Sequence, residues 1–445
     1  MPTRLPPAVS FSEALRFWIK LGFISFGGPA GQISVMHQEL VERKRWISER
    51  RFLHALNYCM LLPGPEAQQL ATYIGWLLHR TWGGIVAGGL FVLPSLFILI
   101  GLSWIYMAYG DLPAVAGLFY GIKPAVTAIV VFAAFRIGSR ALKNAWLWAI
   151  AGTSFVSIFA MHVPFPAIVL AAGVLGYLGS RLRPEYFTLG GGHGATDTPH
   201  EPSVIDDHTP IPDHARFSWP SFWTHLGIGI GLWAAALGGL VGIYGWNHPL
   251  AQMGWFFTKA ALLTFGGAYA VLPYVYQGAV EHYHWLTPLQ MIDGLALGET
   301  TPGPLIMVVT FVGFVGGWTT TLFGPDALLW AGIVAATVVT FFTFLPSFLF
   351  ILIGGPIVES THGDLKFTAP LTGITAAVVG VILNLALFFA YHVLWPQGFA
   401  GRFEWIPALI GIAAFVALYR FKIPIIPVVG ACAAAGFLLK FLGMA

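Results

Sequence analysis

The chain has 445 residues, of which 57% are hydrophobic and only 9% are Asp, Glu, Lys or Arg. Soluble domains carry about a quarter of charged residues, so this composition cannot cover a water-facing surface and excludes a soluble globular enzyme. It predicts an all-α polytopic membrane protein embedded in the lipid bilayer. The formal net charge of +3 argues against a nucleic-acid partner, and the two distant cysteines form neither a metal site nor a disulfide framework, so no cofactor is expected.

Stretches without charged residues define the expected membrane segments, since about 20 apolar residues suffice for one crossing. Thirteen are predicted, near 11–36, 52–79, 82–109, 112–135, 145–160, 163–180, 221–245, 251–276, 290–318, 327–357, 368–392, 405–419 and 423–442. Between the sixth and seventh, residues 184–215 contain six acids and no Lys or Arg, which predicts a flexible, solvated linker. The chain therefore divides into an N-terminal repeat (1–183), an acidic linker (184–216), an extra helix (217–250) and a C-terminal repeat (251–445).

An internal repeat relates the two halves. A shift of 239 residues aligns Lys20–Pro65 with Lys259–Pro304 without a gap, and 12 of the 46 pairs are identical. The identities include two Phe-Gly-Gly motifs and two Pro-Gly-Pro motifs, and further on the Leu-Pro-Ser sequence at 93–95 matches that at 345–347. The halves are therefore expected to be duplicates of one fold.

The two copies are predicted to enter the membrane from opposite sides, because one extra segment precedes the second copy. The link after the first segment carries Arg43, Lys44, Arg45, Arg50 and Arg51, whereas its counterpart, Gly278–Gln290, carries no Lys or Arg. By the positive-inside rule these links face opposite compartments. Segments 11–36 and 52–79 either span the membrane or form re-entrant hairpins, and the re-entrant arrangement, which places the basic link in the cytoplasm, is preferred.

The motif set resembles a known family. SFGGP at 25–29, LPGPEAQQ at 62–69 and LPS at 93–95, with TFGG, TTPGP and LPS in the second half, closely resemble the chromate ion transporter family in its long two-domain form, from about residue 13 to the C-terminus. The resemblance implies a multi-pass bacterial inner-membrane protein that exports chromate, coupled to the proton gradient, and gives chromate resistance. Ala268 in place of Pro29, and Leu305 in place of Glu66, predict unequal roles for the halves.

Three alternatives stay open. Sulfate or a related oxyanion shares the charge and tetrahedral shape of chromate, so hydrogen-bond donors alone separate them poorly. An integral-membrane enzyme acting on a lipid-linked phosphate is the alternative of another class, but it needs a His/Asp pair or a carboxylate metal site that the segments do not show. A passive scaffold is disfavoured by the repeated helix breaks. The sequence also leaves open whether the chain forms a homodimer.

Glycine and proline at membrane depth predict helix breaks, because proline removes a backbone donor and glycine adopts unusual dihedrals. After each break a new half-helix begins with unpaired N–H groups and a positive dipole end, which together bind anions. Six glycines are candidates for this role: Gly27, Gly28, Gly64, Gly266, Gly267 and Gly303. Simple kinks and packing seams are the alternative, and this alternative is preferred for Pro94 and Pro346, which lack glycine partners.

Hydroxyl and amide side chains near the breaks complete the candidate substrate site. Ser25 and Thr264 precede the glycines and either donate to an oxyanion or bond back to their own helix. Gln68 and Gln69 fall in the first turn after Pro65, and one of them is expected to face inward.

Three lysines are further candidates. Lys20 and Lys259 each lie six residues, about 9 Å of helix, before their Phe-Gly-Gly motif. Snorkelling to the membrane surface is the alternative for both. Lys123 lies in the middle of a segment, where a buried charge is costly and usually functional, and it has no matching cation at Thr375.

Glu66 is the candidate for proton coupling. It directly follows Pro65 at the start of a half-helix, where an acid also stabilises the helix terminus. An ionised Glu66 competes with a dianion for the same N–H groups, so proton uptake is expected to accompany anion binding. Glu299 is the comparable acid of the second copy, but it lies on the other side of its break.

Overall fold

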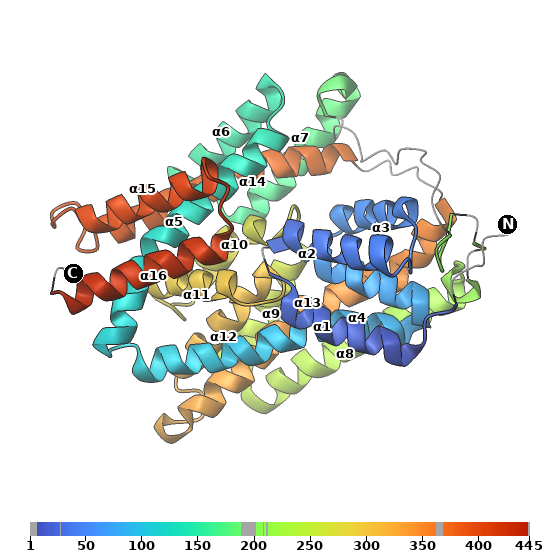
Figure 1. Ribbon diagram of the computed structural model, residues 1–445, viewed down its shortest axis with the longest axis horizontal. Coiled ribbons are helices and arrows are strands. Elements are labelled where there is room, and N and C mark those ends of the chain that lie inside the picture. Colours follow the sequence, from blue (N-terminus) through green and yellow to red (C-terminus); the bar gives the residue numbers. More distant parts are fainter. Residues whose placement is uncertain are drawn as a thin grey trace.

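The computed structural model describes residues 7–26, 28–187, 202–207, 209–210, 212–361 and 368–443, and within these ranges it contains helices and loops but no strand (Figure 1). The first repeat comprises α1 (Phe11–Ile24), α2 (Gly28–His37), η1 (Gln38–Arg43), α3 (Glu49–Leu61), α4 (Glu66–Tyr109), α5 (Pro113–Ala141), α6 (Ala145–Phe159) and α7 (Phe165–Leu182). After α8 (Trp219–Tyr244), the second comprises α9 (Pro249–Leu262), α10 (Ala268–Tyr276), η4 (Gln277–His282), α11 (Pro288–Thr300), η5 (Leu305–Met307), α12 (Val308–Thr319), α13 (Leu328–Thr361), α14 (Thr368–Leu394), α15 (Trp405–Tyr419) and α16 (Ile425–Phe441).

Within the described part of the chain, six helices are long and apolar enough to cross a membrane: α4, α5, α7, α8, α13 and α14. Four shorter helices, including α15 and α16, are also apolar. The extra helix α8 packs on α9 and α13 and leaves large apolar side chains such as Trp223 and Ile230 exposed, as a lipid-facing helix does. The expected all-α polytopic membrane fold is confirmed.

The duplication extends to the turns of the backbone. In each repeat a six-residue π-helix, η1 or η4, ends in a turn with a residue of positive φ: Arg45 at 52° and His284 at 54°. The next helix then begins at a side-chain cap, Ser48 before α3 and Thr287 before α11. All of these positions keep the shift of 239 residues, so the two halves fold as copies of one unit.

Helix breaks occur where glycine and proline predict them. α1 ends at Ile24 and α2 starts at Gly28, while α3 and α4 are separated by residues 62–65. The corresponding gaps in the second repeat are 263–267 and 301–304. Pro94 and Pro346 instead lie inside α4 and α13, which continue through them. The four predicted breaks are therefore confirmed, and the two isolated prolines do not interrupt their helices.

α4 is a hairpin of two helices rather than one rod. His79 and Arg80 have non-helical dihedrals, and Arg80 adopts φ 56°. The two arms approach closely because their facing residues are small: a Cβ atom at Gly75 would lie 2.5 Å from the Gly83 carbonyl oxygen. The turn at 79–80 agrees with the predicted boundary between segments 52–79 and 82–109.

The two repeats interlock through their last three helices. α5 packs against α15 and α16, and its counterpart α14 packs against α6 and α7, so these helices form one group in Figure 1. Glycines permit the crossings, since a Cβ atom at Gly121 would lie 1.9 Å from the Cys432 carbonyl oxygen, and one at Gly373 would lie 2.4 Å from that of Ala172. The contacts are thus reciprocal, because α5 and α14 each pack on the last two helices of the other half.

The described part of the linker differs from the flexible tether expected of it. Ile205 forms a parallel bridge with Ile47, and the hydroxyl of Ser48 donates a 2.6 Å hydrogen bond to Asp207. The side chain of Arg51 donates to the Thr209 carbonyl at 2.8 Å. These hydrogen bonds and the burial of Ile205 hold this part of the linker against the link of the first repeat. Residues 188–201 lie outside the described residues.

We predict that the repeats are antiparallel in the membrane. Glu42 and Glu281 are equivalent acids at the ends of η1 and η4, and both are exposed. Glu42→Cys and Glu281→Cys are placed separately in a Cys59→Ala/Cys432→Ala background and labelled with a membrane-impermeant maleimide. Each should react from one side of the membrane only, and from opposite sides. Labelling of both from the same side contradicts the inversion.

Candidate functional site

Two backbone hydrogen bonds join the breaks of one repeat to the breaks of the other. The Gly64 amide donates to the Thr264 carbonyl at 2.7 Å, and the Gly303 amide donates to the Ser25 carbonyl at 2.8 Å. Gly303 is the counterpart of Gly64, and Thr264 is the counterpart of Ser25. The two bonds are therefore equivalent, with the donor in the first repeat in one case and in the second repeat in the other. Each break leaves a carbonyl without an intrahelical partner at the end of α1 or α9, and the Pro-Gly-Pro loop of the other half satisfies it.

Glycine is required in both Pro-Gly-Pro loops. Gly64 has φ 127° and Gly303 has φ 102°, which residues with a Cβ rarely adopt. A Cβ atom at Gly64 would lie 2.4 Å from the Ser347 hydroxyl oxygen, and one at Gly303 would lie 2.8 Å from the Cβ atom of Ser95. Each Pro-Gly-Pro loop therefore rests against the Leu-Pro-Ser motif of the other half.

The Gly-Gly breaks are less crowded. Gly28 and Gly267 also have positive φ, 68° and 91°, but a Cβ atom at either would meet open space. At Gly266 the nearest atom to such a Cβ would be the Thr375 hydroxyl oxygen, at 3.8 Å. Gly27 lies outside the described residues. Free volume thus adjoins the Gly-Gly breaks, whereas the Pro-Gly-Pro loops are tightly packed.

We call the place where the two backbone hydrogen bonds join the repeats the crossing. Hydrogen-bond donors without a protein acceptor lie around it. The hydroxyls of Ser95 and Ser347 are buried and have no partner among the described residues. α4 begins directly after Pro65 without a side-chain cap, and within the same ranges the amides of Glu66, Ala67 and Gln68 have no protein acceptor. Buried donors are normally satisfied, so this set is suited to a bound anion or water.

Both predicted glutamines are buried beside the crossing. The Gln69 amide donates to the Pro63 carbonyl at 2.8 Å, and the Gln68 amide donates to the Thr72 hydroxyl at 3.0 Å. A third, Gln32 on α2, donates to the Gly303 carbonyl at 2.5 Å. Sequence reasoning missed Gln32, although a single amide within a run of apolar and small residues is a signal. Its counterpart is Val271, so the crossing is chemically unequal on its two sides.

The hydroxyls of Ser25 and Thr264 bond back to their own helices. Ser25 donates to the Leu21 carbonyl at 2.6 Å and Thr264 donates to the Ala260 carbonyl at 2.7 Å. Both residues are buried, but they meet the other repeat through their backbone carbonyls rather than through their hydroxyls.

Two of the three candidate lysines have partners that suit the membrane surface. The Lys20 side chain is 59% exposed and lies 3.8 Å from Glu39. Lys259 lies over the Trp255 ring, 5.7 Å from its centroid, a cation–π contact. Neither contact brings its ammonium group to a Pro-Gly-Pro loop.

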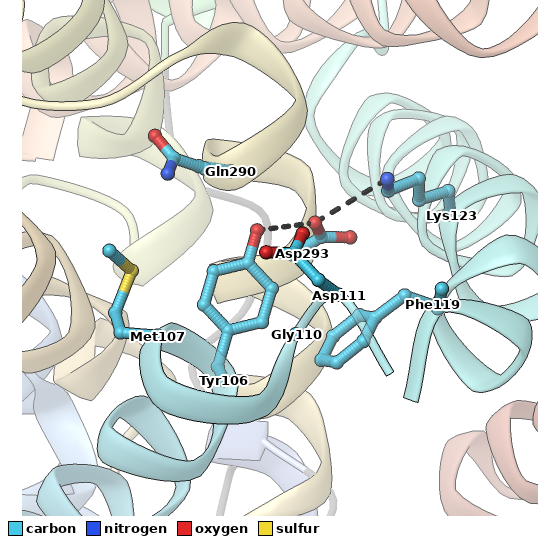
Figure 2. A pocket seen from close by; sticks show the side chains of 9 residues that line it. Tyr106, Met107, Gly110, Asp111, Phe119, Lys123, Gln290 and Asp293 are labelled. Atoms are coloured by element: carbon cyan, nitrogen blue, oxygen red, sulfur yellow. Dashed lines mark hydrogen bonds and ion pairs between the residues drawn. The ribbon is translucent and has the colours of Figure 1, made fainter. Parts of the chain in front are cut away.

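Lys123 has a buried partner that the sequence did not reveal. Its ammonium group lies 3.5 Å from Asp293 Oδ2 on α11, and the Tyr106 hydroxyl donates to the same oxygen at 2.8 Å (Figure 2). These three residues line a cavity of about 320 Å³ between the end of α4, the start of α5 and α11. An acid inside an apolar segment was the available signal for Asp293, but its partner is 170 residues away.

The two acids considered for coupling lie in different environments. Glu66 starts α4, is partly exposed and has no hydrogen-bond or ion-pair partner among the described residues. Glu299 is buried near the end of α11 and accepts a hydrogen bond from the Tyr269 hydroxyl of α10. Only Glu66 is therefore free to exchange its proton without breaking a contact with another side chain.

A duplicated, polytopic helical membrane protein with uncapped half-helices at its centre belongs to the class of membrane transporters. The Chromate transporter family model matches residues 12–177 and 251–437, and the chain belongs to this family. It is 31% identical to a chromate transport protein of Pseudomonas aeruginosa, covering 98% of this chain and 94% of that protein. Identity to a chromate transport protein of Cupriavidus metallidurans is 30%, covering 86% and 84%. No solved structure matches the chain.

We predict that Gly64→Ala and Gly303→Ala each lower transport about tenfold or more. Positive φ costs a residue with a Cβ about 1–2 kcal/mol, and the added methyl group also meets the opposing Leu-Pro-Ser serine. Gly89→Ala is the control, because a Cβ atom at this α4 glycine would meet nothing within 4 Å. Initial rates are compared at equal amounts of monodisperse protein. Transport by both variants at the wild-type rate would show that the Pro-Gly-Pro loops only help the helices to pack and take no part in transport.

Proposed function

We propose that this protein transports chromate across the bacterial inner membrane and exports it from the cell. The observation that carries the proposal is the crossing of the two repeats, where buried hydroxyl and amide donors lack protein acceptors. Membership of the family and the names of the relatives support chromate as the substrate. Export lowers the concentration of chromate inside the cell and so gives resistance.

The proposed site binds a dianion mainly through dipoles. The amides that open α4 carry the positive end of the helix dipole, and the hydroxyls of Ser95 and Ser347 add neutral donors. No Lys or Arg side chain is buried among the described residues. A site without a full positive charge holds a dianion loosely enough to release it, which a transporter requires as much as binding.

The substrate is tested with purified protein in liposomes loaded with chromate. We expect protein-dependent efflux of chromate that sulfate inhibits less strongly than unlabelled chromate does. Gly64→Ala protein, for which transport at least about tenfold slower is expected, serves as the low-activity control. Efflux of sulfate in preference to chromate would reassign the protein to sulfate or a related oxyanion, and no efflux of either anion would contradict the proposal.

We propose further that Glu66 couples transport to the proton gradient. Its carboxylate stands at the same N–H groups that the anion would occupy, so protonation of Glu66 removes a competing negative charge. The equivalent position in the second repeat is Leu305, so Glu66 has no acidic counterpart there.

Glu66→Gln is expected to keep chromate exchange at equal pH on both sides and to lose acceleration by an imposed pH gradient. The measurement compares efflux with and without the gradient in the same liposomes. Glu185→Gln, at an exposed acid in the short helix after α7, is the control and should respond like the wild type. If the pH gradient accelerated chromate efflux by Glu66→Gln as much as by the wild type, Glu66 would only stabilise the start of α4 and would not couple transport to protons.

A further inference from the structure

The cavity beside Asp293 lies apart from the crossing of the two repeats. It is formed where the end of α4 meets α5 and α11, and its lining includes Tyr106, Asp111, Lys123, Gln290 and Asp293. Figure 2 shows the side chains of Tyr106 and Lys123 converging on Asp293 from two sides. Lys123 belongs to the first repeat and Asp293 to the second, so the ion pair joins the halves.

The ion pair is long, its lysine is partly exposed to the cavity, and one oxygen of its aspartate has no partner among the described residues. The Asp293 side chain is 3% exposed, whereas that of Lys123 is 26% exposed. The distance of 3.5 Å between Lys123 Nζ and Asp293 Oδ2 is longer than a good charge-assisted hydrogen bond, which measures about 2.7–2.9 Å. Asp293 Oδ1 is buried and has no partner among the described residues. Lys123 is therefore available to a second anion, while Asp293 depends on Lys123 and Tyr106.

Three hydroxyl-bearing residues of α4 lie between this cavity and the crossing. Ser95, Ser103 and Tyr106 lie on one face of α4, at i, i+8 and i+11, and span about 16 Å at 1.5 Å per residue. Ser103 is fully buried, and its hydroxyl, like that of Ser95, has no partner in the described ranges. Ser95 contacts the Pro-Gly-Pro loop at Gly303, and Tyr106 contacts Asp293.

We propose that this cavity is a second oxyanion site, in which the arriving anion replaces Asp293 as the partner of Lys123 and Asp293 takes up one proton. This inference rests on the proposed function, because it takes the same tetrahedral dianion as ligand. The Gln290 amide also lines the cavity, and the Tyr106 hydroxyl, which donates to Asp293 in the ion pair, is a second neutral donor there. Ser103 then provides the next donor along α4 towards the crossing.

The charges in the cavity require the proton. Lys123 carries one positive charge, and Asp293 and the exposed Asp111 carry two negative charges, so the empty site is already negative. A carboxylate that loses its partner inside a protein is strongly destabilised, so Asp293 takes up a proton from the bulk solution once the anion binds Lys123. When the anion leaves, the proton is released and the ion pair re-forms.

Among the described residues, Asp111 is the only charged side chain that lines the cavity besides Lys123 and Asp293. Lys123 approaches from α5, Tyr106 from α4 and Asp111 from the turn after α4. α12, α14 and α16 also pack against α11, but the lining of the cavity includes no residue from these three helices. The proton taken up when an anion enters this second site is therefore assigned to Asp293, separately from the proton proposed for Glu66 at the crossing.

The test measures protons bound per chromate bound, using full-length purified protein. Isothermal titration calorimetry in buffers of different ionisation enthalpy, at pH values where chromate is fully deprotonated, gives this number directly. The wild type should take up about one proton more than Asp293→Asn, which should still bind chromate. Glu185→Gln should keep the wild-type number, because Glu185 is exposed in the short helix after α7 and does not line the cavity.

Two further variants keep the test decisive if Asp293→Asn is poorly folded. Lys123→Arg retains the charge and should retain proton uptake. Lys123→Gln/Asp293→Asn leaves no unpaired charge in the cavity and should lose the same proton as Asp293→Asn, while Glu66 is unchanged. An unchanged proton number in Asp293→Asn or in the double variant overturns the inference. Absence of chromate binding to the wild type would instead contradict the proposed function.

Discussion

The fold depends on how a membrane protein satisfies the backbone where its helices break. An unpaired carbonyl or amide in the hydrocarbon region costs several kcal/mol, and lipid offers no partner. Here the carbonyls of Ser25 and Thr264 are satisfied by amides of the opposite repeat, at Gly303 and Gly64. Each half therefore supplies what the other lacks. The interlocked α5 and α14, each packed on the last two helices of the other repeat, have the same consequence.

The sequence predicted those features that depend on local chemistry. Glycine and proline broke the helices where expected, and the shift of 239 residues correctly matched turns as small as those at Arg45 and His284. It did not predict which group each break would meet, because a bond between Gly64 and Thr264 joins positions 200 residues apart. The sequence also left the partners of the Ser25 and Thr264 hydroxyls open between an anion and their own helix. Here the competing partner is local, because a serine or threonine hydroxyl can always reach a carbonyl of the preceding turn.

Charge composition was a weaker guide than residue pattern. The linker was expected to be solvated because it is acidic, yet Ile205 and Asp207 dock on the basic link of the first repeat. Lys123 was recognised as unusual from its place in an apolar segment, but Asp293 was not assigned to it. In the linker, the structure shows hydrogen bonds and the burial of Ile205 where composition indicated only solvation. For Lys123, it shows that Asp293 is the opposite charge, which composition did not indicate.

The two repeats share one backbone plan but differ in chemistry, since Gln32, Glu66 and Lys123 have the counterparts Val271, Leu305 and Thr375. α10 and α11 pack on α14 and α5, whereas α2 and α3 pack on α4. Such inequality can give a bound anion different affinities on the two faces of the membrane. It cannot by itself move the anion against a gradient, because at equilibrium every forward step is balanced by its reverse. The direction of net flow must be set by the free energy of a second ion, so the unequal residues are of use to a pump only if they bind that ion together with the anion.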